Sequence, residues 1–155
     1  MTIDEDTALA QLLHQHVLDV LGRLAETGEP DTDPDAVAAF RDAVLPPAPV
    51  TLPVAAGLFV DLNWWLDACD DDELDPDYAV KLLEESATLV QGLPEARLER
   101  LLATVATLAA GETHPARRYQ FRFVPYAFGL LDDEPDLDEP DSLAWTPPAD
   151  RAPIR

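Results

Sequence analysis

The stretch PVAAGLFVDLNWWLDAC, Pro53 to Cys69, decides the fold of this 155-residue chain. Its apolar residues recur at the spacing of an α-helix, and they fall on nearly every side of that helix. A helix that is apolar all round is buried by other elements. The sequence therefore predicts a central helix, although Gly57 and the β-branched residues Val54 and Val60 lower its intrinsic helix propensity.

Asp61 is the charged residue in the middle of this apolar stretch. At 100° per residue it borders the apolar stripe of the helix, and a carboxylate that is partly buried there needs a hydrogen-bonding partner. The arginines of residues 115–128 are suitable donors. The alternative is that Asp61 lies on a polar edge beside Asn63 and Asp67, and the sequence leaves both interpretations open.

The tryptophans are candidate binding anchors. Trp64 and Trp65 are adjacent, so we expect one to enter the core and the other to face a groove or a partner. Leu143 and Trp145 lie in acidic surroundings near the C-terminal end and resemble a short linear motif that docks an aromatic ring into a groove. That groove belongs either to a partner or to this same chain.

Helix signals occur on both sides of the central stretch. Asp-Pro-Asp triplets at residues 33–35 and 75–77 each combine an N-cap residue with a proline in the first turn, and Thr2 to Glu5 form a capping-box pattern. Periodic apolar residues follow each start. Besides the central one, the expected helices cover residues 2–27, 33–45, 76–91, 94–111 and 115 onward.

The connector around Gly92 is short, which predicts that residues 76–91 and 94–111 form an antiparallel helical hairpin. The helical spacing of its apolar residues also predicts which side of the first of these helices faces the core. The side chains expected to point inward from it are Val80, Leu83, Ala87 and Val90.

Residues 115–128, PARRYQFRFVPYAF, combine three arginines with five aromatic residues in a chain that has only 10 basic residues. Between residues 119 and 124 aromatic and polar residues alternate as in a strand, but the aromatic spacing also fits a helix. Pro125 interrupts either element. We expect a helix from Pro115 that kinks or restarts near Pro125, with a short strand around 119–124 as the alternative.

The arginines of this segment allow two interpretations. Arg118 and Arg122 stand one helical turn apart and, with Tyr119 and Tyr126, would form an anion-binding pocket. We favour an internal clamp instead, because the chain has 31 acidic residues to pair with. In that interpretation Arg117, Arg118 and Arg122 bind carboxylates elsewhere, and the first candidates are Asp61 and the acidic loop at residues 70–77.

The net charge of −21 limits the classes of partner. It repels nucleic-acid phosphates and anionic lipid surfaces and attracts basic proteins, so we expect no direct nucleic-acid binding. Solubility alone explains such a charge equally well. The longest uncharged stretch, residues 43–60, contains four prolines and does not predict a membrane span.

A single cysteine, Cys69, excludes an intrachain disulfide and a cysteine-based zinc site, and it fits a reducing cytoplasm. The acidic residues near Met1 do not predict a secretory signal. The carboxylates beside Cys69 raise the pKa expected for its thiol, which disfavours a cysteine nucleophile.

No metal or cofactor site is expected. The acidic loop lacks the glycine and glutamate positions of a calcium-binding helix–loop–helix motif. His14 and His16 are two residues apart and diverge on a helix, and His16 falls on the apolar stripe as a hydrogen-bonded core imidazole. His114 precedes a proline and is as suited to capping a helix as to binding a metal. No nucleotide-binding glycine loop and no serine hydrolase motif is present.

These patterns predict an all-α protein, a compact bundle of five to six helices over residues 1–131 with an acidic, proline-rich extended tail at 132–155. We expect the tail to contribute little to core stability. The favoured function is a non-catalytic, cytoplasmic protein-binding module, such as an inhibitor, immunity-type protein or adaptor, that engages a basic partner. The alternatives are a small-ligand-binding protein or enzyme with an anion pocket, and a DNA mimic. The candidate binding residues are Asp61, Trp64, Arg118, Tyr119, Arg122, Tyr126 and Trp145.

Overall fold

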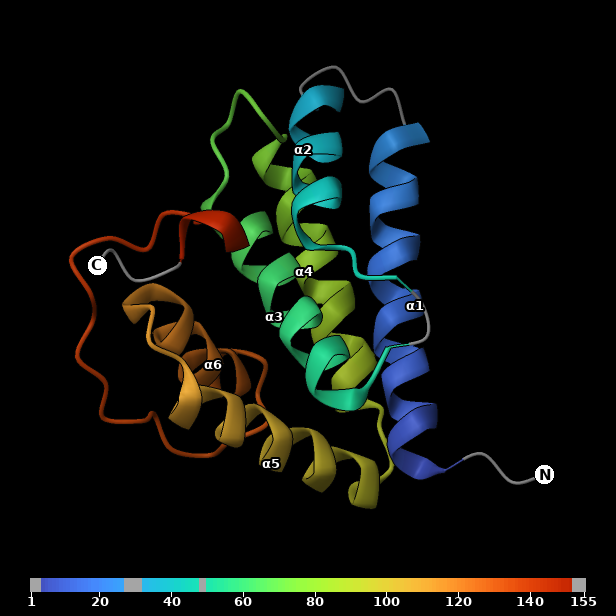
Figure 1. The fold of residues 1–155 in the computed structure, drawn as a ribbon, viewed down its shortest axis with the longest axis vertical. Helices are drawn as coiled ribbons and strands as arrows, with labels where there is room; N and C mark the ends of the chain where they lie inside the picture. Colours follow the sequence, from blue (N-terminus) through green and yellow to red (C-terminus); the bar gives the residue numbers. More distant parts are fainter. Residues whose placement is uncertain (1–3, 27–31, 48–49, 152–155) are drawn as a thin grey trace.

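The computed structural model describes residues 4–26, 32–47 and 50–151, and all regular structure in these residues is helical (Figure 1). The all-α prediction is confirmed, and a helix rather than a strand covers residues 119–124. The elements are α1 (Glu5–Glu26), α2 (Pro34–Val44), α3 (Leu52–Ala68), α4 (Pro76–Gln91), α5 (Glu95–Gly111), α6 (Pro115–Ala127) and a short 3-10 helix, η1 (Pro148–Asp150).

Helix α3 is the centre of the bundle, as its all-round apolar character predicts. Every residue from Ala55 to Leu66 is buried, and each of the other five α-helices contacts α3. Figure 1 shows α1, α2 and α4 grouped on one side of α3 and α5 and α6 on the other. A residue of α3 is therefore covered from all sides, which sets the environment of Asp61.

The two Asp-Pro-Asp triplets begin helices α2 and α4. The side chain of Asp33 accepts a hydrogen bond from the N–H of Asp35 at 2.9 Å, and Asp75 accepts one from Asp77 at 3.4 Å. Both contacts satisfy backbone donors that have no partner inside the helix. The capping-box residue Thr2 and the end predicted for the first helix at residue 27 lie outside the described residues.

Helix α6 begins at Pro115 as predicted, runs through Pro125 and ends at Ala127, so that of the two alternatives, a kink or a restart near Pro125, the restart is not observed. Gly129 follows with a φ of 75°, a left-handed conformation that suits glycine. Its N–H donates to the carbonyl of Tyr126 at 3.0 Å, and the N–H of Leu130 donates to the carbonyl of Pro125 at 2.9 Å. This pair of bonds is the Schellman arrangement, which closes the helix.

The predicted inner face of α4 is correct at Val90, which is buried, and partly correct at Leu83 and Ala87, which are half-buried against the core. Val80, which was expected to point inward, is 53% exposed. The buried face of α4 includes a polar residue, which the apolar pattern does not reveal. Ser86 is fully buried, and its hydroxyl lies 2.8 Å from Nε2 of His16 on α1. The buried face consists of Ala79, Leu82, Ser86 and Val90.

Helices α4 and α5 do not form the predicted antiparallel hairpin. After Gly92 the chain turns, and α5 crosses the lower end of the bundle in Figure 1. It packs mainly against α6, with further contacts to α3 and α1. A short connector brings two helix ends together but does not fix their crossing angle, which here follows from the apolar faces of α5 and α6.

The contact between His16 and Ser86 confirms that His16 is a hydrogen-bonded imidazole, although the side chain is half-buried and not part of the core. Burial lowers the pKa of His16 below its ordinary value of 6.5, and nearby Arg23 adds to this effect, while Glu85 and Asp19 oppose it. The neutral imidazole is therefore the form that the folded protein favours.

We expect the His16 contribution to stability to be lost on acidification. The unfolded chain takes up the His16 proton at a higher pH than the folded chain, so this contribution is complete above the ordinary pKa and declines as the pH falls through the folded pKa. Urea unfolding between about pH 7.5 and pH 5.5 should show a steeper loss in the parent than in His16→Gln. Parallel pH profiles for the two proteins would contradict this assignment.

Candidate functional site

The structure separates the seven candidate residues into two regions. One is a buried cluster on α3 that the C-terminal segment covers, and the other is the outer surface of α6. The first region contains Asp61, Trp64 and Trp145, and the second contains Arg118, Tyr119, Arg122 and Tyr126.

Asp61 is bound by two arginines. It is 4% exposed, and its Oδ1 accepts hydrogen bonds from Nε of Arg117 at 3.0 Å and from Nη2 of Arg151 at 3.2 Å. Its Oδ2 is 3.3 Å from Nη2 of Arg117 and 3.5 Å from Nη1 of Arg151. Each guanidinium thus meets both carboxylate oxygens. Of the two interpretations that the sequence left open for Asp61, the structure supports burial against an arginine of residues 115–128, and that arginine is Arg117.

Glu112 completes what we call the Asp61 cluster, defined as Asp61, Glu112, Arg117 and Arg151. Its Oε1 accepts a hydrogen bond from Nη1 of Arg117 at 2.6 Å. Burial acts to raise the pKa of Glu112, but the Arg117 contact and backbone N–H groups hold it below its ordinary value. Two carboxylates therefore balance two guanidinium groups in a site where an unpaired charge would be costly.

Gly57 has no Cβ atom and so leaves space on α3 for the guanidinium group of Arg117. It lies on α3 one turn before Asp61, and a Cβ atom at this position would be 2.9 Å from Nη2 of Arg117. Burial acts to lower the pKa of Arg117, but Asp61 and Glu112 together raise it. Burial also lowers the pKa of Arg151, and Asp61 only partly offsets this effect. The Asp61 carboxylate is thus the group that both arginines depend on.

The C-terminal segment covers the other side of the cluster. The Nε1 of Trp64 donates to the carbonyl of Leu143 at 2.8 Å, and the Trp64 and Trp145 rings pack edge to face at 4.8 Å. The guanidinium carbon of Arg151 lies 5.5 Å from the Trp64 ring centre and 5.0 Å from that of Trp145. The Leu143–Trp145 motif therefore docks on its own chain.

Both tryptophans of α3 are buried, so neither one is an exposed anchor. Trp65 stacks on Phe40 of α2 at 4.5 Å, whereas Trp64 faces the groove that Trp145 fills. Trp145 also contacts Phe40, at 5.0 Å. The expected division between a core tryptophan and a groove tryptophan holds, and the occupant of the groove is the protein's own tail.

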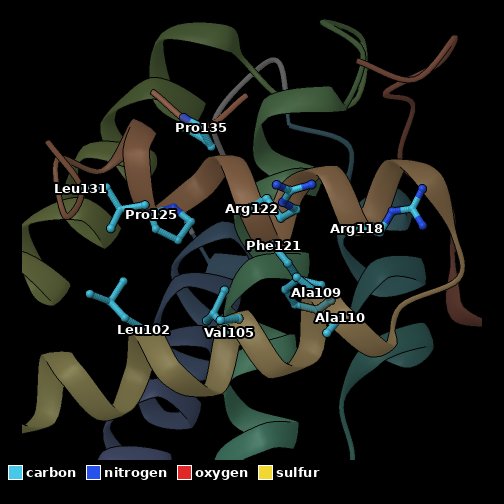
Figure 2. A pocket seen from close by; sticks show the side chains of 11 residues that line it. Leu102, Val105, Ala109, Ala110, Arg118, Phe121, Arg122, Pro125, Leu131 and Pro135 are labelled. Carbon is cyan, nitrogen blue, oxygen red and sulfur yellow. The ribbon is translucent and has the colours of Figure 1, made fainter. Parts of the chain in front are cut away.

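The predicted clamp is wrong for two of its three arginines. Arg118 and Arg122 are exposed and make no ion pair within the described residues, and the acidic loop at 70–77 receives no arginine there. The reason is the helical period, because Arg117 points toward α3 while Arg118 and Arg122 lie on a neighbouring side of α6 that faces α5. These two residues instead line a groove of about 540 Å³ between α5 and α6 (Figure 2).

Tyr119 and Tyr126 do not line this groove, so the predicted pocket of arginines and tyrosines is not formed as a unit. They belong to an aromatic row on α6, in which Tyr119 stacks on Phe123 at 5.4 Å and Phe123 contacts Tyr126 at 6.1 Å. Partial burial raises the pKa of Tyr119, and the carboxylates of Glu139 and Glu134 raise it further. The acidic tail therefore passes close to the aromatic row.

A second hollow lies between the tail and the start of α6. We call it the tail hollow, and it has a volume of about 460 Å³. Glu139 and Asp141 contribute carboxylates to its lining, and Ser142 and Thr146 contribute hydroxyls. His114 lines it from the other side, where its Nδ1 also caps α6 by accepting a weak bond of 3.4 Å from the N–H of Arg117.

The sequence did not predict Arg151 and Glu112 as members of the Asp61 cluster, or Gly57 as the residue that lies beside it. Gly57 offered a signal, because a glycine inside an otherwise apolar helix often marks a close approach of another group. Arg151 offered a weaker one, since it follows the acidic run of the tail and lies near Trp145. Glu112 offered none, as carboxylates are frequent throughout the chain.

Replacing Arg118 or Arg122 with alanine should change the free energy of unfolding by no more than about 0.5 kcal/mol, because both side chains are exposed and unpaired in the described structure. Arg117→Ala serves as the contrasting variant, since it removes a partner of buried Asp61. Urea unfolding measures all three. A large loss in Arg118→Ala would restore the original clamp hypothesis.

Burial raises the pKa of the Cys69 thiol to about 11, and the nearby carboxylates of Glu73, Asp70 and Asp67 add to this effect. The thiol is thus protonated at neutral pH, in line with the direction that its sequence neighbours predict. Within residues 4–26, 32–47 and 50–151, no three His, Cys, Asp or Glu side chains are grouped so as to hold a metal ion. In the same residues no helix has the length and apolar character needed to cross a membrane.

Comparisons of the chain with protein-family models, with curated proteins and with solved structures give no match.

Proposed function

We propose that this protein is a non-catalytic, cytoplasmic binding module that recognises a basic segment of a partner protein. The observation that carries the proposal is the position of the acidic tail beside the aromatic row of α6. Glu134 and Glu139 are close enough to raise the pKa of Tyr119, and Glu139 and Asp141 line the tail hollow. Carboxylates and partly exposed aromatic rings on one surface are two kinds of group that attract lysine and arginine side chains.

The distribution of ion pairs supports a strongly acidic surface. Within the part of the chain that the structure describes, five basic residues are already bound to carboxylates: Arg23, Arg97, Arg100, Arg117 and Arg151. The acidic residues of the tail between 132 and 141 are exposed and make no ion pair within the described residues. The net charge of −21 therefore leaves a surplus that would steer a basic partner toward the surface.

The aromatic anchors of this interface differ from those that the sequence suggested. Trp64 and Trp145 pack against each other within the molecule and so are not available as anchors for a partner. Tyr119, Phe123 and Tyr126 are half-buried and remain accessible from outside. An aromatic face that is partly in contact with solvent can take up a cationic side chain, which contributes on the order of 1 kcal/mol at such a site.

The test begins with affinity capture from cell extract and mass spectrometry at low and high salt, followed by direct titration of the captured basic protein. One variant carries Glu134→Gln, Glu139→Gln and Asp141→Asn. Its control carries Asp70→Asn, Asp71→Asn and Asp72→Asn, which removes the same charge from the loop before α4. We expect the tail variant to lose about tenfold in affinity, a change of roughly 1.4 kcal/mol, and the loop variant to lose much less.

Two results would reject the proposal. Equal losses in the tail and loop variants would mean that overall charge rather than this surface attracts the partner. An affinity that stays constant as the Debye length is reduced below about 10 Å would mean that the interaction is not electrostatic.

A further inference from the structure

The groove between α5 and α6 combines an apolar floor with a cationic edge. Helix α5 contributes Val105, Ala106 and Ala109, and α6 contributes Phe121 and Pro125. The alanines explain why the groove is open, because their short side chains leave space between two helices that otherwise pack closely. Figure 2 shows the apolar side chains of α5 directed toward α6, with Leu131 at one end.

Arg118 and Arg122 provide the cationic edge. Both are exposed, and both line the groove from α6, one turn apart. Figure 2 shows Arg122 close to Phe121 and Arg118 beyond Ala110, so that charge is present along the side of the apolar floor. In a chain with 31 acidic residues, these two guanidinium groups make no ion pair within the described residues.

We propose that this groove binds a small organic anion with an apolar body, of the class of medium-chain carboxylates. The carboxylate would accept hydrogen bonds from the guanidinium groups of Arg118 and Arg122, whose planar forks match its two oxygens. The hydrocarbon chain would lie over Val105 and Phe121 toward Leu131. The volume of about 540 Å³ is in the range of pockets that hold single small ligands.

Two features of the groove favour this ligand class over others. An apolar ligand without charge would leave the two guanidinium groups without a contact, and a small anion without a chain would leave the apolar floor open. A basic segment of a partner would be repelled by Arg118 and Arg122 at this position. The groove is therefore a site distinct from the tail hollow, with a ligand of opposite charge, and it does not depend on the proposed function.

The test is titration of the whole protein with octanoate below its micelle concentration, followed by calorimetry and by backbone amide chemical shifts. Acetate and octan-1-ol are the matched probes, because one lacks the chain and the other lacks the charge. We expect saturable binding of octanoate, with shifts at residues of the groove, and at least about tenfold weaker binding of both other probes.

The variants Arg118→Gln and Arg122→Gln should each weaken octanoate binding several-fold, and the double variant should weaken it more than tenfold. Ala106→Leu should also weaken it, because Ala106 is exposed in the groove and a larger side chain fills the space without disturbing the core. Arg41→Gln is the control, as it removes an exposed arginine on α2 outside the groove. Circular dichroism checks that each variant is folded.

Three results would overturn the proposal. These are the absence of saturable octanoate binding, equal affinity for octan-1-ol, and chemical shift changes that map outside the groove. Sedimentation analysis adds a fourth: a dimer that Ala106→Leu dissociates would show that a second copy of the chain, and not a small anion, covers this surface.

Discussion

Replacing Asp61 with alanine is expected to lower the free energy of unfolding by roughly 3–5 kcal/mol, the largest effect that we expect from a single substitution. The carboxylate is 4% exposed and accepts hydrogen bonds from two guanidinium groups. Without it, Arg117 and Arg151 remain close together in a buried site, and only Glu112 is left to offset their charge. Urea unfolding monitored by tryptophan fluorescence measures the loss.

Asp67→Ala is the matched control, because Asp67 is an exposed aspartate on the same helix. Its effect should stay within about 0.5 kcal/mol. A second comparison separates the charge from the packing: Asp61→Ala combined with Glu112→Gln, Arg117→Met and Arg151→Met removes all four charges of the Asp61 cluster, and should recover much of the lost stability. Equal stability of Asp61→Ala and Asp67→Ala would contradict the role that the structure gives to Asp61.

Sequence patterns predicted the elements of the fold correctly in those parts of the chain where one physical signal dominated. The central position of α3 could be predicted because its residues are apolar on every side, and the starts of α2 and α4 because Asp33 and Asp75 combine capping with a following proline. The inner face of α4 could not be predicted in full, because Ser86 is buried although its polar side chain indicates a surface position. Its burial is explained only by its partner on α1.

The candidate site was predictable in its chemistry but not in its partners. A buried carboxylate needs a donor, and this requirement led from Asp61 to the arginines of α6. Which arginine contacts it depends on the rotation of α6 about its own axis, and a difference of one residue turns the side chain by 100°. The choice of Arg117 over Arg118 therefore required the packing of α6 against α3. The second donor, Arg151, is far away in the chain and no local pattern predicts its contact.

The contact between Arg151 and Asp61 also changes the contribution to stability that we expect from the C-terminal segment. From its composition, residues 132–155 should contribute little to stability, since they are acidic, rich in proline and poor in periodic apolar residues. In the structure the described part of this segment, residues 132–151, passes around the outside of α6 and returns to α3 (Figure 1). Few of its residues reach the core, but Trp145 and Arg151 do so at the buried cluster.

Truncation after Leu131 is therefore expected to lower the melting temperature by about 10 °C, which corresponds to a loss of roughly 3–5 kcal/mol for a chain of this length. It removes one of the two arginines that bind Asp61, exposes the face of Trp64 that Trp145 covers, and leaves the Trp64 N–H without its acceptor on Leu143. Differential scanning calorimetry of the truncated and full chains measures the change.

A control distinguishes these contacts from the mere presence of the tail. Replacing residues 132–141 with a glycine–serine linker of equal length keeps Trp145 and Arg151 but removes the acidic run, and it should leave the melting temperature within a few degrees of the parent. Trp145→Ala and Arg151→Met, made separately in the full chain, should each reproduce part of the loss. If the truncated protein instead melts with the parent, Asp61 is adequately paired by Arg117 alone, and the tail contacts contribute no net stability because the entropy lost in ordering the segment cancels them.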